Sequence, residues 1–165
     1  MATPTTLPAT QTTGNVLTAS WVNDLRGAFR ILQVVQSTYS SYTLHNNTTY
    51  NDTGLSATIT PSATSSKILV LAFNNGTVKG AEASGNALNL QLLRGSTQIQ
   101  EVQNLHLSAT SLLMVGTCHV QILDSPNTTS AVTYKMQGKN SVSSSTVGTQ
   151  FGSTTSTMVL MEVSA

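Results

Sequence analysis

Residues 68–73, ILVLAF, decide the fold class of this 165-residue chain. As a strand this segment is apolar on both faces, which is typical of a strand at the centre of a sheet or of one whose outer face is covered by a neighbour. Working outward, Leu88, Leu90 and Leu92 alternate with polar residues, as in strands that turn one face to a core. The segment 68–73 is therefore expected to be a strand of an all-β domain that is either central or covered on its outer face.

Short runs rich in Thr, Ser and Val continue this pattern through the chain. Strands are expected at 30–36, 41–45, 55–60, 67–74, 87–94, 97–102, 112–123, 131–137, 146–152 and 157–163. Gly, Asn, Asp and Pro are expected to form turns at 51–54, 61–62, 74–76, 85–86, 95–96, 124–127 and 138–140. Short strands without intervening helices predict a β-sandwich with a jelly-roll-like arrangement.

The composition indicates a surface of hydroxyls and amides. Only 8% of the residues are charged and the net charge is +1, against roughly 25% charged residues in an average protein. Scattered cations give no phosphate-binding surface, so no nucleic-acid partner is expected. The sequence has no run of 18 or more apolar residues, so no membrane span is predicted. The N-terminus has no signal-peptide pattern. A surface with little charge repulsion between copies favours an oligomer or a larger assembly.

Catalytic and metal-binding signatures are missing from the sequence. The three histidines share no metal-ligand spacing (His45, His106 and His119), and no nucleophile elbow or phosphate loop occurs. The lone Cys118 is expected to be a buried small hydrophobe. The sequence therefore predicts a protein that is not an enzyme and has no cofactor and no metal.

The carboxylates do not suggest a paired acid and base either. Asp52 and Asp124 are interpreted as ordinary turn residues, and Glu162 as a polar residue at a strand edge or between subunits. Glycosidase-type catalysis requires two carboxylates on facing positions, and this pattern gives little support for such a pair.

The N-terminal part, residues 1–28, is predicted to be a separate unit from the β domain at 29–165. Residues 1–13 contain prolines among threonines and are expected to be an extended arm. Thr18 as an N-cap and Gly27 as a C-cap frame one short helix with an apolar stripe, which is too short to persist without a surface to pack on. That surface is either the end of this chain's own core or another subunit. The predicted assembly residues are Leu7, Val16, Leu17, Trp21, Val22, Leu25 and Phe29.

Three tyrosines form a second candidate site. Tyr39, Tyr42 and Tyr50 lie in the segment TYSSYTLHNNTTY, and amphipathic rings of this kind can stack on sugars at binding surfaces. A glycan contact at these residues is one reading, and loop packing or a subunit contact is the other.

Several segments resemble a β module of tailed-bacteriophage structural proteins. They are ILQVVQSTYSS at 31–41, TTYNDTGLSATITPSATSSKILVL at 48–71, ILDSPNTTSAVTYKMQG at 122–138 and STMVLMEVSA at 156–165. The preceding TGNVLTASWVNDL resembles the entry segment found before such modules in virion proteins. The resemblance covers roughly residues 29–165 and rests on the order and spacing of these segments.

The resemblance implies a non-enzymatic component of the virion. The leading expectation is a trimeric capsid decoration (cement) protein, with copies of itself and the phage major capsid protein or another virion protein as partners. It would be held on the particle through its N-terminal arm and assembled in the host cytoplasm. The alternatives are a short tail-fibre or receptor-binding module that contacts host glycans, and a free carbohydrate-binding module.

Overall fold

The computed structural model describes residues 16, 31–81, 85–109, 111–142 and 145–164. Of the predicted assembly residues, only Val16 belongs to this part of the chain, and its side chain is exposed. The other predicted assembly residues lie outside the described part of the chain: Leu7, Leu17, Trp21, Val22, Leu25 and Phe29. The predicted short helix and the domain boundary at residue 28 lie outside it as well. No helix in the described part is long and apolar enough to cross a membrane.

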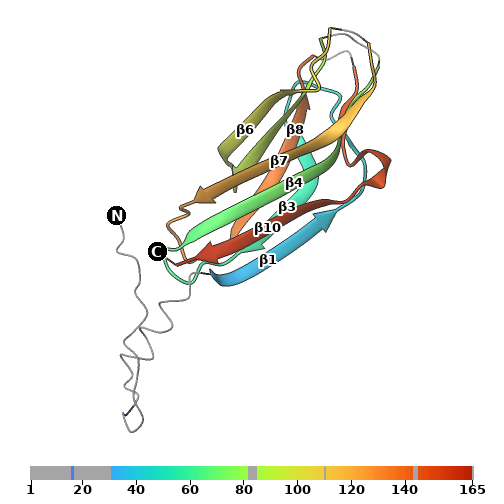
Figure 1. The fold of residues 1–165 in the computed structure, drawn as a ribbon. Helices are drawn as coiled ribbons and strands as arrows, with labels where there is room; N and C mark the ends of the chain where they lie inside the picture. The colour runs from blue at the N-terminus through green and yellow to red at the C-terminus, as the bar shows by residue number, and fades with distance from the viewer. Residues whose placement is uncertain (1–15, 17–30, 82–84, 110, 143–144, 165) are drawn as a thin grey trace.

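The described residues form two antiparallel sheets that face each other (Figure 1). Sheet A has the order β1-β10-β4-β9-β2, and β7 pairs with the other side of β4. Its strands are β1 (Ile31–Tyr39), β10 (Ser156–Val163), β4 (Lys67–Lys79), β7 (Met114–Asp124), β9 (Val147–Thr149) and β2 (Thr43–Leu44). Sheet B has the order β3-β8-β5-β6, with β3 (Asn51–Ile59), β8 (Val132–Asn140), β5 (Leu88–Arg94) and β6 (Thr97–Leu105).

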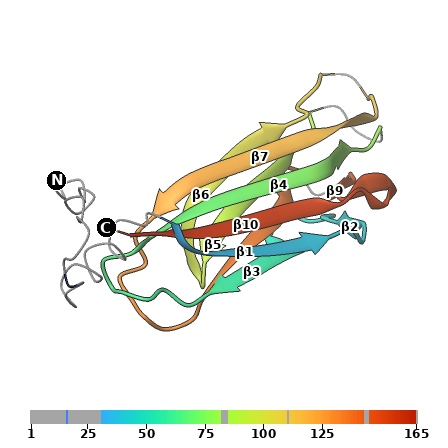
Figure 2. The same cartoon turned by 60° about the horizontal axis from the view of Figure 1, so that its bottom comes forward.

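The order of the eight long strands confirms the predicted sandwich. In Figure 2 the strands β7, β4, β10 and β1 lie side by side in one layer, with sheet B behind them. The two four-strand sets, β1-β10-β4-β7 and β3-β8-β5-β6, have the arrangement of a jelly roll. The strand β4, which contains the segment 68–73, pairs with β10 on one side and with β7 on the other, so this segment is central as expected.

Each of the ten predicted strand regions contains a strand, but three predicted turns were wrong. Residues 51–54, 74–76 and 138–140 lie inside β3, β4 and β8. The register shifts between Asp52 and Ser56 in β3 and between Asn75 and Thr77 in β4. The segments 51–54 and 74–76 are therefore β-bulges that bend a strand without ending it. The predicted strand 146–152 is also shorter than expected, because a single 3-10 turn, η1 (Phe151–Ser153), follows β9.

The core lies between the sheets and is built from the inward-facing residue of each alternating pair. Its members include Leu55, Ile68, Leu90, Met158 and Leu160, all with no exposed surface. Cys118 belongs to the same cluster and is 6% exposed, which confirms its predicted role as a small buried hydrophobe. Burial raises the pKa of its thiol.

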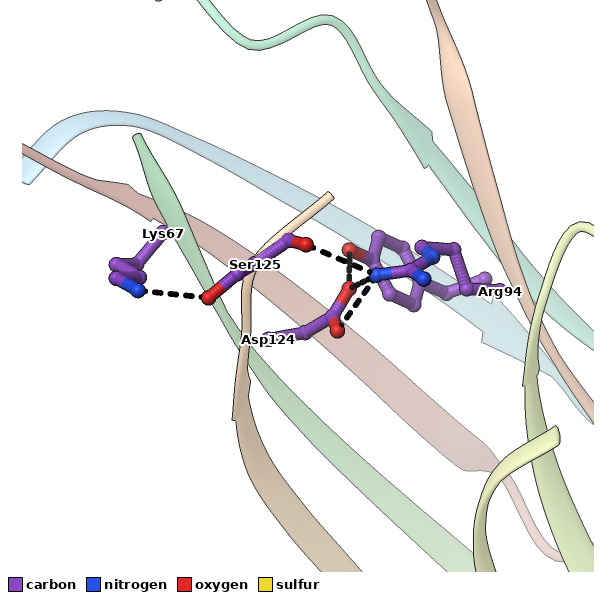
Figure 3. Close-up of polar contacts among 5 residues, drawn as sticks. Lys67, Arg94, Asp124 and Ser125 are labelled. Atoms are coloured by element: carbon purple, nitrogen blue, oxygen red, sulfur yellow. Dashed lines mark hydrogen bonds and ion pairs between the residues drawn. The ribbon is translucent and has the colours of Figure 1, made fainter. Parts of the chain in front are cut away.

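An ion pair ties the two sheets together where β7 ends (Figure 3). Arg94 at the end of β5 donates to both carboxylate oxygens of Asp124, at 2.8 and 2.9 Å. The Tyr134 hydroxyl of β8 donates to the same carboxylate at 2.7 Å. The reading of Asp124 as an ordinary turn residue was therefore wrong, because sheet B supplies two donors that the local sequence does not reveal.

Glu162 anchors the corner of the sandwich where β1 begins. The carboxylate is fully buried and accepts hydrogen bonds from the Ser62 backbone N–H at 2.7 Å, the Ser62 hydroxyl at 2.6 Å and the Gln33 side chain at 2.6 Å. Burial by itself raises the pKa of this carboxyl, but the hydrogen bonds from Ser62, Ser66 and Gln33 outweigh it and lower the pKa to about 2. Glu162 is thus neither a strand-edge residue nor an inter-subunit residue in this fold, because β10 is paired on both sides and its partners come from the same chain.

Candidate assembly interface

The outer face of sheet A carries a continuous row of apolar side chains. Val34, Met161, Leu69 and Leu123 are successive partners in the register and contribute one residue each from β1, β10, β4 and β7. Their neighbours along each strand point into the core, so these four side chains face away from it. Val34 is 57% exposed and Leu123 is 56% exposed, so the row is open at both ends.

Further apolar residues extend this row in both directions along the strands. The side chains that make up what we call the sheet A face are Leu32, Val34, Leu69, Leu71, Phe73, Leu123, Val159, Met161 and Val163. Farther along the strands the face becomes mixed, because Gln36 and Gln121 flank Val159 and Leu71 in the next row. The apolar surface is therefore concentrated at the end of the sheet where the chain enters from residue 30.

The sheet A face has almost no charge. Among the described outward-facing residues of its four long strands, Lys67 is the one Lys, Arg, Asp or Glu side chain, and its ammonium donates to the Ser125 hydroxyl at 2.7 Å (Figure 3). His119 packs its ring edge-on against Phe73, with the ring centroids 4.7 Å apart. A partner that covers this face would not need to neutralise buried charge.

The outer face of sheet B has the opposite character. Its corresponding row across β3, β8, β5 and β6 is Asp52, Gln137, Gln91 and Glu101. Gln137 donates to Asp52 at 2.6 Å, and Gln91 donates to Gln137 at 2.8 Å. These polar groups satisfy one another within the chain, so the sandwich has one apolar outer face and one polar outer face.

Covering the sheet A face would give a substantial free energy. Complete burial of a Val, Leu or Met side chain is worth about 1.5–3 kcal/mol. Val34 and Leu123 are each more than half exposed, so roughly 1 kcal/mol is available from each. Because continuous apolar patches on single soluble chains mark interaction sites, this face is the candidate functional site.

Sequence reasoning did not find these residues as a site. Val34, Leu69, Leu123 and Met161 come from four separate parts of the chain, and only the register of sheet A brings them together. One signal was present, because residues 68–73 are apolar on both faces and one predicted cause was a covered outer face.

The three tyrosines predicted as a glycan contact have different neighbours. The Tyr39 ring packs against the core and lies over Gly54. Tyr42 meets Phe151 edge-on at 5.5 Å between ring centroids. The Tyr50 hydroxyl donates to Glu101 at 2.5 Å. The three tyrosines thus contact different residues in the structure, and glycan binding at them stays a prediction.

The four described carboxylates are all engaged by the fold. Asp52 pairs with Lys135 at 3.0 Å, and Asp124, Glu101 and Glu162 have the partners given above. A shallow pocket of about 110 Å³ lies beside the β3 bulge, and its two charged lining residues, Asp52 and Lys135, are the ion pair just named. Within the described residues no group of three His, Cys, Asp or Glu side chains could hold a metal ion.

Comparisons with known proteins find similarity only to solved structures. No protein-family model matches the sequence, and no curated protein matches it. The crystal structure of the infectious bursal disease virus VP2 subviral particle is similar over 80% of this chain and 32% of that chain, with 13% identity and a TM-score of 0.45. The structure of the infectious bursal disease virus Gt strain is similar over 82% of this chain and 39% of that chain, with 13% identity and a TM-score of 0.39.

A third neighbour comes from a bacterium. The crystal structure of dimeric latent PorU from Porphyromonas gingivalis is similar over 77% of this chain and 13% of that chain, with 10% identity and a TM-score of 0.37. The chain thus spans less than two fifths of each of these neighbours. At such identities and TM-scores these likenesses assign no function to it.

Proposed function

We propose that this chain is a non-enzymatic structural protein of a virus particle, and that it works by assembling with other protein subunits through the sheet A face. The observation that carries this proposal is the apolar row of Val34, Met161, Leu69 and Leu123, which the described part of the chain leaves open. The polar row on sheet B would remain in contact with solvent. An assembled particle provides a permanent partner for such a one-sided surface.

The finer proposal is a homotrimeric decoration protein on a bacteriophage capsid. It is supported by the resemblance of residues 29–165 to modules of tailed-phage structural proteins and by the 8% content of charged residues. The segment before β1 would reach the capsid protein or a neighbouring subunit, since 30 residues precede Ile31. An arm that becomes ordered over many contacts contributes affinity only when it is bound.

The oligomeric part of the proposal is tested by the mass of the full chain in solution. Analytical ultracentrifugation is expected to give a trimer for the natural sequence. Val34→Lys and Leu123→Lys place a charge on the sheet A face and should weaken the trimer at least tenfold, because a buried unpaired charge is costly. Thr58→Lys on the outer face of sheet B is the matched control and should not change the mass. A monomer at all concentrations would overturn the trimer.

The virion part of the proposal needs a separate experiment. Particles of the virus that encodes this chain are purified and their proteins identified by mass spectrometry, and an affinity-labelled copy is located by electron microscopy. The chain is expected as a stoichiometric particle component on the capsid shell. A label on the tail would favour the tail-fibre alternative, and absence from the particles would overturn a structural role in them.

A further inference from the structure

The sequence of segment 17–29 contains a stripe of apolar residues, and the sheet A face is an apolar surface without a cover in the described part of the chain. The inference drawn from this pair rests on the proposed trimer. In a closed three-fold assembly each contact joins two different surfaces of the same protein, because only two-fold contacts join a patch to itself. The sheet A face must therefore meet another part of a neighbouring copy. That part should be apolar and free of unmatched charge.

The sequence just before β1 has these properties. Its apolar residues recur at spacings that would place them along one side of a helix; they are Leu17, Trp21, Val22, Leu25 and Phe29. Of the charged residues between them, Arg26 lies outside that stripe, and Asp24 lies at its edge, seven residues after Leu17. The predicted helix between Thr18 and Gly27 has about nine residues and would be about 14 Å long. This length matches the width of roughly 14 Å across the four neighbouring strands of the apolar row.

The place where the chain enters the sandwich also favours this pairing. Ile31 pairs with Val163 at the corner of sheet A, next to the row of Val34, Met161, Leu69 and Leu123. Ile31 itself is 55% exposed. Each copy in a trimer would therefore present its segment 17–29 from the same end of the molecule that carries the apolar surface.

The length of the connection argues against the chain's own face. Only Arg30 separates Phe29 from the first residue of β1. The predicted helix ends at Gly27, so residues 28–30 would have to reverse the chain for the helix to reach its own sheet, and Phe29 of the stripe would lie within that reversal. The complete stripe therefore fits its own sheet poorly. A neighbour's face requires no such reversal.

From these observations we infer that the sheet A face of each copy is the docking site for segment 17–29 of a neighbouring copy. The apolar stripe lies along the row of Val34, Met161, Leu69 and Leu123. The trimer is then held by an exchange of entry segments around the three-fold axis.

Two single-cysteine variants of the full chain test this exchange. Leu25→Cys and Val34→Cys are co-expressed with different affinity tags and treated with a short bifunctional maleimide. Cys118 is 6% exposed and should not react. A cross-linked dimer that carries both tags is expected, with at least tenfold more product than from Leu25→Cys combined with Ser56→Cys on the outer face of sheet B. Thermal melts establish that each variant is folded.

The natural fluorophore gives a second readout that needs no cross-linking. Trp21 is the only tryptophan of the chain and lies within the segment. Its emission should be blue-shifted in the trimer and should shift to the red on dilution into monomers and in Val34→Lys. Ser56→Lys should leave the emission unchanged.

The possible failures are distinguishable. Cross-linking within one chain of the Leu25→Cys/Val34→Cys double variant, without mixed-tag dimers, would overturn the exchange and assign the segment to its own face. No cross-link in a trimeric sample would overturn the docking site but leave the trimer standing. A natural chain that is monomeric by ultracentrifugation would remove the proposed function itself.

Discussion

At the scale of single residues, His45 is a buried titratable side chain that the fold keeps neutral. It is fully buried, and neither ring nitrogen has a hydrogen-bond partner among the described residues. Its ring packs against Gly138, where a β-carbon would come within 2.7 Å of Nε2. Burial lowers the pKa of this imidazole from 6.5 to about 4.

Acid should therefore destabilise the fold through His45. The unfolded chain binds a proton near pH 6.5, whereas the folded chain binds one only near pH 4, so stability is complete above pH 6.5 and falls as the pH drops toward 4. The loss of stability over this range is about 3 kcal/mol.

Urea denaturation between pH 7.5 and 4.5 measures this loss. In the His45→Gln variant the free energy of unfolding should depend less steeply on pH. His106, whose pKa burial also lowers, is present in the natural chain and in the variant, so its contribution cancels in the comparison. Equal slopes would show that His45 is not responsible.

Glu162 belongs to the same scale but acts in a lower pH range. The pKa of its carboxyl is lowered from 4.5 to about 2, so its contribution is present above pH 4.5 and disappears as the pH falls through 2. Glu162→Gln removes the charge that Ser62 and Gln33 donate to and should cost about 1.5–3 kcal/mol at pH 7. Chemical denaturation checks this value.

A matched control for Glu162 is the carboxylate on the outer face of sheet B. Glu101 accepts from Tyr50, and this hydrogen bond lowers the pKa of its carboxyl, but the residue is only partly buried. Glu101→Gln should therefore cost less than about 1 kcal/mol. A cost for Glu162→Gln no greater than that would contradict the anchoring role of Glu162.

At the scale of the strands, two glycines with positive φ serve different purposes. Gly54, with φ of +86°, sits in the β3 bulge, where a β-carbon would lie 2.3 Å from the Tyr39 ring. Gly95, with φ of +57°, lies in the β5–β6 hairpin, and nothing is within 4 Å of the β-carbon position. Both sites need a positive φ, and Gly54 lies farther from the left-handed region that other residues adopt, while the steric requirement is present only at Gly54.

Alanine at these two positions should separate the two requirements. Gly95→Ala adopts the left-handed conformation at a cost of about 1–2 kcal/mol. Gly54→Ala adds overpacking against Tyr39, which costs a further 1–3 kcal/mol or so. Thermal or urea denaturation of both variants measures the difference. Equal destabilisation would mean that the Tyr39 ring moves aside without cost.

The same glycines explain how far the strands could be predicted from sequence. Alternation and the segment 68–73 were sufficient to place the strands and the sandwich, because each inward residue repeats with a period of two. Gly54 and Gly76 looked like turn residues because positive φ is needed both in turns and in bulges. Only the partner strand decides between them, and pairing across long sequence distances is not visible in a local pattern.

At the scale of the whole molecule, the difference between the two outer faces could not be predicted from single strands. Leu69 reads as one more residue of a central strand, and Met161 as part of the last strand. The register places them next to each other between Val34 and Leu123. The candidate site therefore depends on topology, whereas the predicted arm and helix residues rest on local spacing alone and stay a prediction.

Removal of residues 1–28 tests both the domain boundary and the exchange of segments. The truncated chain should fold cooperatively, because the residues of the hydrophobic core cluster come from the strands between Leu55 and Leu160. It should sediment as a monomer and bind more of a hydrophobic dye such as ANS than the full chain, since the sheet A face would lose its cover. Circular dichroism, ultracentrifugation and dye fluorescence measure these three properties.

Each alternative gives a different outcome for the truncated chain. If the sheets of separate copies pack directly on one another, the truncated chain will remain a trimer and dye binding will not increase. If Trp21 and Leu25 close one end of their own core, it will unfold or melt at a much lower temperature. The expected combination of a folded monomer with an open apolar face arises only when the segment is dispensable for folding and required for assembly.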